Sequence, residues 1–376
     1  MKKILFITTR NPYSKKYSGD VLRSNKIINL LKKKYKLDIL CFESKKSLPE
    51  QNLIYFKPPN YFFKIFYCLF SLFKFLPIQF GLFFSKEMKE YVEDYANNYD
   101  YIFFYHIRSS QYLPKDFNGR TIIEMGDLYS ENYTQTYNYL SFLNPLKYIY
   151  FLESILVKNA EKEIFENFDK KILFSENEVK KINRNLKHKI FKINESIGRI
   201  NKKFLFKKDN FKILFIGNIN YLPNFLACRD FKKNILPKLK KKIPKVKFYI
   251  IGNINSIYKF LLSSNDIEIL GPKKNLQIYL KNSICGLANL EIATGVQGKV
   301  LTYMSYGLPI ICSEKVANNF KKNVISYNSN PNLIRNLVDL KNNKIKSNKF
   351  SNKSINFSKK LDWKKVGLQY LRVLDF

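Results

Sequence analysis

Histidine and arginine are scarce in this chain of 376 residues. The only histidines are His106 and His188, so a histidine-based metal site is nearly excluded. Arginine supplies nine of the 66 basic residues. Because proteins that read nucleic-acid sequence rely on the bidentate contacts of arginine, this lysine-rich balance argues against specific nucleic-acid binding.

We expect neither disulfide-forming cysteines nor a cleavable leader. None of the five cysteines forms a C-x-x-C motif, and most lie in apolar runs, which predicts buried thiols in a reducing compartment. The start, "MKKILFITTR", resembles a signal peptide, but its apolar part is too short and is followed by no small-residue cleavage site. We interpret it as the first strand of the fold.

Acidic residues are few. The chain has 30 of them against 66 basic residues, a formal net charge of +36. Such a charge indicates an anionic partner, namely nucleic acid, a membrane surface or a phosphorylated substrate. The alternative is coding bias, since lysine and asparagine are both abundant, as in AT-rich genomes. The composition leaves both interpretations open.

No apolar run is long enough to cross a bilayer, which takes about 20 residues. The candidate is the phenylalanine-rich segment 60–84, where Lys64 and Lys74 bracket only nine residues. One interpretation is a pair of interfacial helices, with rings among lipid headgroups and lysines on anionic lipid. The other is a pair of ordinary core helices.

Two successive α/β patterns fill the chain, as its length suggests. Apolar runs at 2–9 and 37–42 flank an amphipathic stretch, which is typical of a βαβ unit. The pattern restarts near residue 211. The other expected strands are 101–106, 120–125, 170–175, 211–218, 245–253, 267–271, 284–290, 309–313 and 323–327.

We therefore expect two Rossmann-like domains of the α/β class. The first domain covers residues 1–195, and the lysine-rich stretch 196–210 is a linker without apolar periodicity. The second domain covers residues 211–355. Residues 356–376 form a C-terminal helix that packs back towards the first domain.

The stretch "TGVQGKVLTYMSYGLPII" at 294–311 is the clearest candidate for a binding site. A glycine-rich turn that enters a helix presents free N–H groups and a positive dipole to an anion, and Lys299 lies in the first turn of that helix. The alternative is a tight turn with a solvated lysine. The turns at 216–224 and 271–280 also follow strands, so all three belong at the sheet edge where ligands bind. The chain has neither G-x-G-x-x-G nor a Walker motif, which disfavours dinucleotide and P-loop sites.

These residues carry a family resemblance. The stretches "ILFIGNINYLPN", "NILPKLKKKIPKVKFYIIGN", "IEILGPKKNLQIYL" and "GVQGKVLTYMSYGLPIICS" resemble the nucleotide-sugar domain of family 4 glycosyltransferases with the GT-B fold. They are similar, more narrowly, to the exopolysaccharide sugar transferases. In the first half, "RNPYSKKYSGDVLRSNKIINLLKK" and "FDKKILFSENE" resemble the corresponding loop, helix and strand of that family.

The resemblance implies a retaining, metal-independent glycosyltransferase of the hexosyltransferase type. The nucleotide sugar is a substrate of the second domain, no separate cofactor is needed, and the first domain holds the acceptor across a cleft. The implied donor-binding residues are Gly217, Asn218, Pro272, Lys273, Gly295, Gln297, Gly298, Lys299 and Thr302. The diphosphate lies on the turn, where positive groups stabilise its departure. Gly19, Asp20 and Arg23 close over the donor from the first domain.

Two residues of the first half are catalytic candidates. Asp127, in "EMGDLYSEN", is the carboxylate expected nearest the cleft, although an aspartate that caps a helix from Leu128 is an alternative. His106 ends a strand together with Arg108, although a lone histidine at the end of a strand is more often structural.

The chain departs from the family pattern at two places. The family usually has two carboxylates eight residues apart, the second on the ribose, and here Thr294 and Thr302 occupy those places. A hydroxyl can still bind ribose, but a neutral hydrogen bond is roughly half as strong as a charged one. The donor is therefore held differently, or bound more weakly, or this copy is impaired.

We expect a cytoplasmic enzyme, peripheral on the inner face of the membrane, that transfers sugar to a lipid-linked or surface-polysaccharide acceptor. Its partners are a nucleotide-sugar donor, that acceptor and an anionic membrane surface, with no specific nucleic acid. One alternative is a degenerate, non-catalytic GT-B protein that assists polysaccharide assembly. Another is a GT-B enzyme of a different kind, such as a nucleotide-sugar epimerase.

Overall fold

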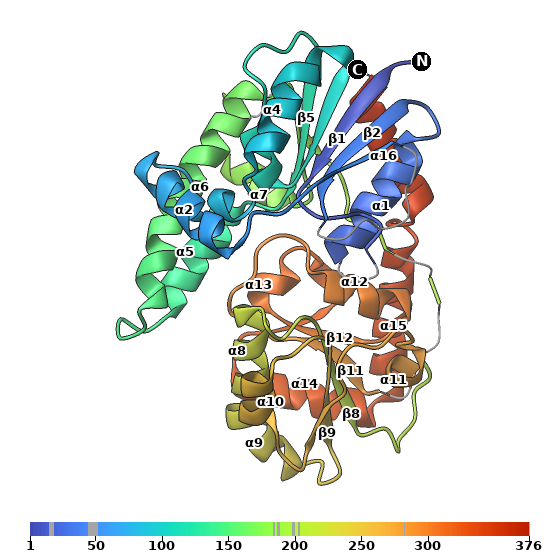
Figure 1. Cartoon of the computed structure of the whole chain (residues 1–376). Helices are drawn as coiled ribbons and strands as arrows, with labels where there is room; N and C mark the ends of the chain where they lie inside the picture. Colours follow the sequence, from blue (N-terminus) through green and yellow to red (C-terminus); the bar gives the residue numbers. More distant parts are fainter. Residues whose placement is uncertain are drawn as a thin grey trace. The chain divides into compact units, whose positions relative to one another are not determined.

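The computed structural model of the chain describes residues 1–14, 19–43, 52–182, 185, 189–197, 200–201, 204–281 and 283–375. His188 therefore lies outside the described residues. The chain divides into two compact units, each with its own core. Unit 1 comprises Met1–Asn194 and Gly367–Phe376, and unit 2 comprises Glu195–Val366. In Figure 1 the labelled elements of both units can be followed by colour along the chain.

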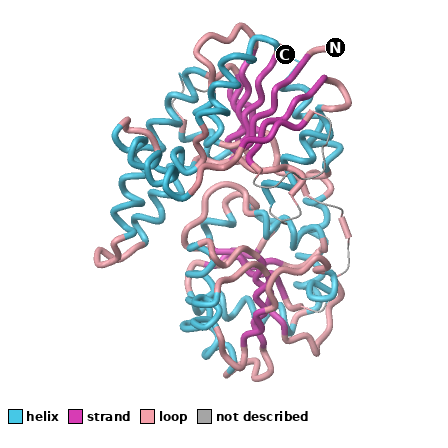
Figure 2. The backbone as a smooth tube through the Cα atoms, in the orientation of Figure 1, coloured by secondary structure: helices cyan, strands magenta, loops and turns pink. Residues whose placement is uncertain are grey.

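Unit 1 is built on a parallel sheet of seven strands in the order β3-β2-β1-β4-β5-β6-β7. Its central strands are almost completely buried, as expected when helices cover both faces of a parallel sheet. Figure 2 shows these strands flanked by helices. The strands are β1 (Lys3–Thr8), β2 (Lys36–Phe42), β3 (Leu53–Phe56), β4 (Tyr101–Tyr105), β5 (Arg120–Gly126), β6 (Lys170–Leu173) and β7 (Ile190–Lys192).

Nine helical segments of unit 1 surround this sheet among the described residues. They are α1 (Gly19–Leu31), α2 (Tyr61–Phe73), α3 (Ile78–Leu82), α4 (Lys86–Tyr95), η1 (Ala96–Asn98), η2 (Ile107–Tyr112), α5 (Tyr129–Tyr139), α6 (Leu146–Asn167) and α7 (Glu176–Lys181). The last helix of the chain, α16 (Trp363–Asp375), begins in unit 2, and its end from Gly367 belongs to unit 1. There the hydroxyl of Tyr370 donates to the buried carboxylate of Glu124, at 2.5 Å.

Unit 2 contains a parallel sheet of six strands in the order β10-β9-β8-β11-β12-β13. The strands are β8 (Lys212–Ile216), β9 (Lys247–Ile251), β10 (Ile267–Ile269), β11 (Cys285–Ala288), β12 (Ile310–Ser313) and β13 (Ile325–Tyr327). Its helices include α8 (Leu222–Asp230), η4 (Phe231–Ile235), α9 (Leu236–Lys240), α10 (Ser256–Leu262), α11 (Gln277–Lys281), α12 (Gly298–Ser305), α13 (Glu314–Ala317), η5 (Lys321–Asn323), α14 (Asn330–Asn342) and α15 (Lys344–Ser358).

In both sheets the order of the strands reverses beside the first strand. In unit 1 the chain moves outward through β2 and β3 and then returns to place β4 on the other side of β1. In unit 2 it moves outward through β9 and β10 and returns to place β11 on the other side of β8. In open α/β sheets ligands bind outside the carboxyl ends of the strands at such switch points. The topology therefore marks two places, one in each unit.

All five cysteines are free thiols, and four of them are buried. The exception to the sequence prediction is Cys68, which is half-buried. Burial raises the pKa of the Cys41 thiol to about 12, so that thiol stays neutral and unreactive at physiological pH.

The phenylalanine-rich segment folds into α2 and α3, but the prediction of ordinary core helices is wrong for α2. Ser71 is its only buried residue. A second group of exposed apolar side chains lies on the hairpin of α5 and α6. We call the two groups together the aromatic face: Phe62, Phe63, Phe66, Leu69, Phe70 and Phe73 on α2, and Phe142, Leu143, Leu146, Tyr148, Ile149 and Phe151 on the hairpin. No helix among the described residues combines the length and apolarity that crossing a bilayer requires.

Candidate functional site

At the switch point of unit 2, strands β8 and β11 part towards their carboxyl ends. They pair at Ile213–Cys285 and Leu214–Gly286. Beyond that point the hydroxyl of Tyr303, from α12, stands between them. It accepts the N–H of Ile216 at 2.8 Å and lies 3.2 and 3.3 Å from the carbonyl oxygens of Leu214 and Leu287. This side chain therefore fixes α12 to both strands.

Gly286 makes this arrangement possible. A Cβ atom at that position would come within 2.4 Å of the Tyr303 ring. The ring therefore lies directly on the backbone of β11, and α12 approaches the sheet more closely than any larger residue at 286 would allow.

The turn before α12 leaves the first N–H groups of that helix available. Gly295 has φ of 58°, in the left-handed region that suits glycine. Gln297 precedes the helix without a side-chain cap and instead donates to the carbonyl of Thr294 at 2.8 Å. Within the described residues, the N–H groups of Gly298 and Lys299 have no partner. A Cβ atom at Gly298 would meet nothing within 4 Å, so a ligand has room there.

Lys299 supplies a positive charge at the same place. Its Nζ donates to Oδ1 of Asn224 at 2.5 Å and lies 4.2 Å from the centre of the Phe215 ring. In the described part of the chain no carboxylate forms an ion pair with it. Burial lowers the pKa of this ammonium to about 7. An anion beside Lys299 would restore its charge, so the residue is ready for a negatively charged ligand.

Asn224, which sequence reasoning did not select, holds the β8 turn and Lys299 together. Its Nδ2 donates to the carbonyl of Asn218 at 2.8 Å, while its Oδ1 accepts from Lys299. Gly217 leaves space for this side chain, since a Cβ atom there would lie 2.9 Å from Nδ2. Asn224 lies within the quoted turn "IGNINYLPN", but only the tertiary contact distinguishes it from the other asparagines.

The turns after β8, β9 and β10 touch through glycine backbone. Gly252, another residue missed by sequence reasoning, has φ of +148°, and a Cβ atom there would come within 1.8 Å of the Gly217 carbonyl oxygen. Its N–H donates to the carbonyl of Gly271 at 3.0 Å. Pro272 and Lys273 follow as exposed residues at the end of the edge strand, so β9 and β8 separate them from β11.

Asn289 is a further residue that the sequence did not indicate. It follows β11, is 2% exposed, and donates to the carbonyl of Ala227 at 2.9 Å. Among the described residues its Oδ1 has no hydrogen-bond partner. An unsatisfied buried acceptor costs about 1–3 kcal/mol, and such costs are usually found where a ligand or water completes the site.

Thr294 and Thr302, which stand where the family pattern has carboxylates, make different contacts. The hydroxyl of Thr302 donates to the carbonyl of Gly298, one helical turn earlier, at 3.0 Å. The hydroxyl oxygen keeps its capacity to accept a hydrogen bond from a ligand. The backbone carbonyl of Thr294 accepts from Gln297, so this residue contributes to the turn itself.

At the switch point of unit 1 lies a cavity of about 190 Å³, which we call the polar pocket. It is lined by residues that follow β1 and β4 and by the start of α1, among them Thr9, Arg10, Asp20, His106 and Arg108. Arg10 and Asp20 form an ion pair. The pocket is therefore lined by two arginines and by one carboxylate, that of Asp20, which already forms an ion pair with Arg10.

His106 is neutral in this pocket. Burial, and next the positive charge of Arg23, lower the pKa of its imidazole to about 3. Its Nδ1 lies 3.0 Å from the hydroxyl of Tyr129, and its backbone has φ of 70°, which is unusual for a residue other than glycine. A neutral imidazole held in this way can exchange hydrogen bonds with a substrate without carrying charge.

Gly19 and Asp20 belong to the first turn of helix α1, and Arg23 follows in its second turn. Only Asp20 of the three lines the polar pocket. Arg23 forms an ion pair with Glu124 at 3.2 Å, lies 3.2 Å from the Tyr105 hydroxyl, and has its guanidinium 4.3 Å from the centre of the Phe174 ring. Its side chain is 14% exposed, so its main contacts are with the interior of unit 1.

Asp127 follows Gly126 at the end of β5, one strand beyond β4 in the sheet. It does not line the polar pocket. Helix α5 begins at Tyr129, and Leu128 rather than Asp127 occupies its capping position. The structure thus places His106 and Asp20 at one pocket and Asp127 beside the next strand.

Part of unit 2 matches a known protein family. Residues 210–340 match the model of the family described as glycosyl transferases group 1. A search of curated protein sequences gave no match. The resemblance to GT-B glycosyltransferases predicted from the sequence is confirmed, whereas its narrower exopolysaccharide type is not.

Solved structures similar to the chain are glycosyltransferases of the GT-B fold. Sucrose-phosphate synthase from Thermosynechococcus elongatus has a TM-score of 0.71 at 14% identity, over 100% of this chain and 98% of that one. HepE from Anabaena, in complex with UDP and glucose, has a TM-score of 0.66 at 14% identity, over 100% of both chains. WaaG, a glycosyltransferase involved in lipopolysaccharide biosynthesis, has a TM-score of 0.63 at 10% identity, over 98% of both. The predicted GT-B fold is therefore confirmed.

Proposed function

We propose that this protein is a glycosyltransferase that holds the diphosphate of a nucleotide sugar at the start of α12 in unit 2. The observation that carries the proposal is the position of Lys299, whose ammonium meets Asn224 across the β8–β11 switch point. Three features support it: the open N–H groups of Gly298 and Lys299, the room at Gly298, and the family match over residues 210–340.

The proposed site would act mainly through electrostatics. When the sugar leaves, negative charge grows on the diphosphate. Free N–H groups at a helix N-terminus and a nearby ammonium stabilise that charge without reorganising, and this is commonly a large contribution to catalysis. These groups supply the positive charge that other enzymes obtain from a divalent metal. We therefore propose a reaction that needs neither metal nor separate cofactor.

The finer assignments rest on the family resemblance. They are retention of anomeric configuration, transfer of a hexose, and a lipid-linked or surface-polysaccharide acceptor. In unit 1 the polar pocket is the proposed acceptor site, with neutral His106 as a hydrogen-bonding group. Asp127, beside the next strand, is the carboxylate proposed to approach the reacting sugar. The related HepE structure contains UDP, which makes UDP the first nucleotide to test.

We also propose that the protein is peripheral to the inner face of a membrane. The exposed rings of the aromatic face support this, because an exposed apolar patch of this kind marks an interaction surface. The net charge of +36 supports attraction to anionic lipid.

Thermal unfolding with UDP, GDP, ADP and CDP tests the donor site. A ligand that binds only the folded state adds RT ln(1 + [L]/Kd), about 2.7 kcal/mol at one hundred times Kd. We expect one diphosphate to stabilise the protein equally with chelator or Mg²⁺, and Lys299→Ala to remove most of that effect. Lys259→Ala, which changes an exposed lysine of α10, serves as the control. Absence of stabilisation by every nucleotide at millimolar concentration would overturn the proposal.

Thr302 favours a second candidate, a protein that binds nucleotide without transferring sugar. Its hydroxyl replaces the usual carboxylate and already donates to Gly298. Nucleotide stabilisation without hydrolysis or transfer of any donor sugar, together with activity in Thr302→Glu, would favour this candidate.

A further inference from the structure

A cavity of about 710 Å³ opens at the amino ends of the unit 1 strands, and we call it the amino-end cavity. Its wall comes from the starts of β1 and β2 and from residues just before β3 and β4, which meet at one edge because the strands are parallel. Three lysines, two asparagines, two tyrosines, an aspartate and a leucine line it. Its volume falls within the usual range of small-molecule sites, about 300–1,000 Å³.

The amino-end cavity is separate from the polar pocket. Strand β1 runs between them, because Lys3 at its start lines the amino-end cavity and Thr8 at its end lines the polar pocket. The six residues of β1 span roughly 17 Å at about 3.3 Å per residue. A ligand in the amino-end cavity therefore occupies a site of its own, about one strand length from the polar pocket.

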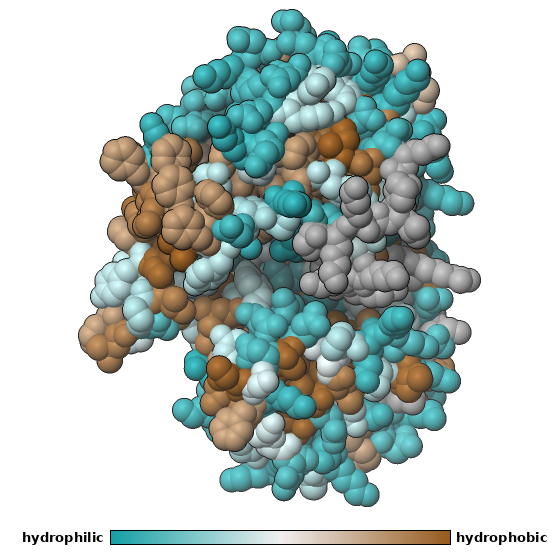
Figure 3. Space-filling view, viewed as in Figure 1, coloured by the Kyte–Doolittle hydropathy of each residue, from teal (hydrophilic) through white to brown (hydrophobic). Residues whose placement is uncertain are grey.

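The surface of unit 1 is hydrophilic and basic at this end. In Figure 3 apolar side chains gather where Figure 1 draws α2 and the end of the α5–α6 hairpin, whereas hydrophilic side chains cover most of the end of unit 1 that carries the N-terminus. Residues 1–3 and 32–36, from this end, contain six lysines and no acidic residue. The local field therefore attracts an anion.

Two lysines lie side by side in the cavity wall. Lys3 and Lys36 are register partners on β1 and β2, whose backbones are about 4.8 Å apart. Both residues are exposed, and no carboxylate among the described residues forms an ion pair with either ammonium. Like charges in register destabilise a sheet, and an anion between them would remove that repulsion. Lys32, which donates to the Tyr13 hydroxyl at 2.9 Å, is the third lysine of the wall.

The rest of the wall suits hydroxyl groups. The Tyr99 hydroxyl donates to Oδ2 of Asp38 at 2.8 Å. Burial, and next the hydrogen bond to Asp38, raise the pKa of Tyr99, so its hydroxyl stays protonated and keeps the carboxylate in place. The other carboxylate oxygen can accept from a ligand, while the amides of Asn52 and Asn98 can both donate and accept. A carboxylate among three lysines disfavours a ligand that is only an anion and favours one that also has hydroxyl groups.

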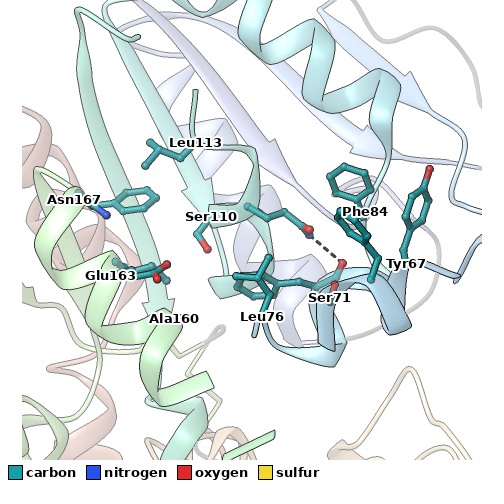
Figure 4. A pocket seen from close by; sticks show the side chains of 14 residues that line it. Tyr67, Ser71, Leu76, Phe84, Ser110, Leu113, Ala160, Glu163 and Asn167 are labelled. Carbon is teal, nitrogen blue, oxygen red and sulfur yellow. Dashed lines mark hydrogen bonds between the residues drawn. The ribbon is translucent and has the colours of Figure 1, made fainter. Parts of the chain in front are cut away.

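Another cavity of unit 1, of about 290 Å³, has the opposite chemistry. It lies between α2, α3, η2 and α6, and most of its wall is aromatic or aliphatic. Figure 4 shows Tyr67 and Leu76 on one side and Ala160 and Glu163, from α6, on the other. Of the described residues that line it, Glu163 alone is charged. This cavity therefore repels an acidic ligand, and the amino-end cavity attracts one.

We propose that the amino-end cavity binds an acidic oligosaccharide, with an acid group between Lys3 and Lys36 and a neighbouring hydroxyl on Asp38. An acidic sugar meets both requirements of the wall, a negative charge for the lysines and hydroxyl groups for the carboxylate and the amides. The inference goes beyond the proposed function, because this site includes neither the donor turn of unit 2 nor the polar pocket. A glycan held here stays attached to unit 1 while the polar pocket remains accessible.

Displacement of a fluorescent ligand from the full-length protein tests the inference. Hyaluronan and polygalacturonate hexasaccharides, labelled at the reducing end, are titrated with protein and followed by fluorescence anisotropy. Salt at about 0.15 M limits attraction by distant charges to roughly 8 Å. We expect the unlabelled acidic hexasaccharides to displace the label. Neutral chitohexaose, which offers the lysines no charge, should need at least about tenfold more. Tripolyphosphate, which has charge but no sugar hydroxyls, should displace the label only weakly.

Matched variants locate the ligand. Lys36→Gln should weaken binding of the acidic hexasaccharides about tenfold. Lys33→Gln removes the same charge from an exposed residue nearby that does not line the cavity, so it should have little effect. Asn98→Ala should weaken binding roughly fivefold, as the loss of a neutral hydrogen bond does. Asn265→Ala, at an exposed asparagine of unit 2, should change nothing. All four positions are exposed, so the variants should fold.

Several results would overturn the inference. One is the absence of binding by both acidic hexasaccharides at millimolar concentration. Equal losses from Lys36→Gln and Lys33→Gln would indicate general attraction to a basic surface, and equal displacement by tripolyphosphate would indicate a site for anions alone. A loss in Arg108→Gln without one in Lys36→Gln would place the ligand in the polar pocket instead. Stabilisation by UDP, measured in parallel, tests only the donor site, so the two proposals can fail independently.

Discussion

The ammonium of Lys299 and the side-chain amide of Asn224 meet at 2.5 Å between two helices that follow different strands. Lys299 belongs to α12, after β11, and Asn224 belongs to α8, after β8. Their contact thus crosses the switch point of the unit 2 sheet. It holds a cation where the topology and the open N–H groups of α12 both favour an anion.

Nucleotide affinity should depend on pH through Lys299. The pKa of this ammonium is lowered to about 7 in the free protein, and a bound diphosphate would raise it. Binding above pH 7 therefore takes up a proton, and affinity should fall by up to about tenfold per pH unit. Calorimetry in buffers of different ionisation enthalpy measures the proton uptake. In Lys299→Arg the guanidinium stays charged, so its nucleotide affinity should not depend on pH in this way. A wild-type affinity that does not change with pH would contradict the assignment of Lys299 to the diphosphate site.

Removing the Lys299 charge should stabilise the unliganded protein. A lysine whose folded pKa lies below its unfolded value of 10.5 destabilises the folded state most below pH 7, and that penalty fades as pH rises from 7 towards 10.5. We expect Lys299→Met to add about 1 kcal/mol at pH 7. The gain should diminish at pH 10, as chemical denaturation can show. Lys259→Met at an exposed position should have no such effect.

Two glycines of unit 2 should respond in opposite ways to alanine. At Gly252 the new Cβ would come within 1.8 Å of the Gly217 carbonyl, with φ at +148°, so Gly252→Ala should lose at least about 1–3 kcal/mol of stability. At Gly298 the space is open, so Gly298→Ala should keep its stability but bind the nucleotide diphosphate more weakly. Thermal melts with and without nucleotide distinguish these effects. Equal stability of the two variants would contradict the packing described.

Thr302→Glu tests whether a ribose contact has been lost. A hydrogen bond to a charged group contributes about 1 kcal/mol more than a neutral one, so we expect roughly fivefold tighter binding of UDP. The gain should vanish for the 2′,3′-dideoxy analogue, which has no ribose hydroxyls. Glutamine has the same side-chain length as glutamate but no charge, so Thr302→Gln should give little gain in UDP affinity. Tighter binding of both nucleotides by Thr302→Glu would exclude a ribose contact.

The aromatic face should bind anionic vesicles. Phe66→Ser combined with Phe73→Ser removes rings that are 53% and 79% exposed, and we expect at least a tenfold loss of binding in flotation assays. The remaining binding should fall with salt, because lysines supply it. Phe260→Ser, at an 80% exposed ring of unit 2, is the matched control and should change nothing. Equal losses from both changes would indicate unspecific hydrophobic contact.

Long buried strands could be predicted from apolar runs, whereas the two short edge strands of unit 1 could not. β1, β4 and β8 all lie within predicted runs because burial on both faces leaves a continuous apolar signal. β3 and β7 were missed. Each has four residues or fewer and no fully buried side chain, so a local pattern hardly distinguishes them from loops.

The site was predictable only where chemistry and local sequence coincide. The turn before α12 and Lys299 carry their own signal, a glycine pair followed by a cation. Asn224, Gly252 and Asn289 gain meaning from neighbours distant in sequence, such as the Gly217 carbonyl that approaches Gly252. Arg23 shows the opposite case. The sequence predicted that its side chain contacts the donor, but its ion pair with Glu124 holds that side chain in the interior of unit 1.

The Tyr303 hydroxyl gives unit 2 an internal reporter. This hydroxyl accepts the N–H of Ile216, where a neighbouring strand would otherwise supply the acceptor. Tyr303 lies on α12, the helix that also contains Lys299. Any ligand that steadies α12 must also steady that amide, four residues after the start of β8. The rate at which the Ile216 N–H exchanges with deuterated solvent would therefore reveal occupancy of the anion site from inside the sheet, with no label and no turnover required.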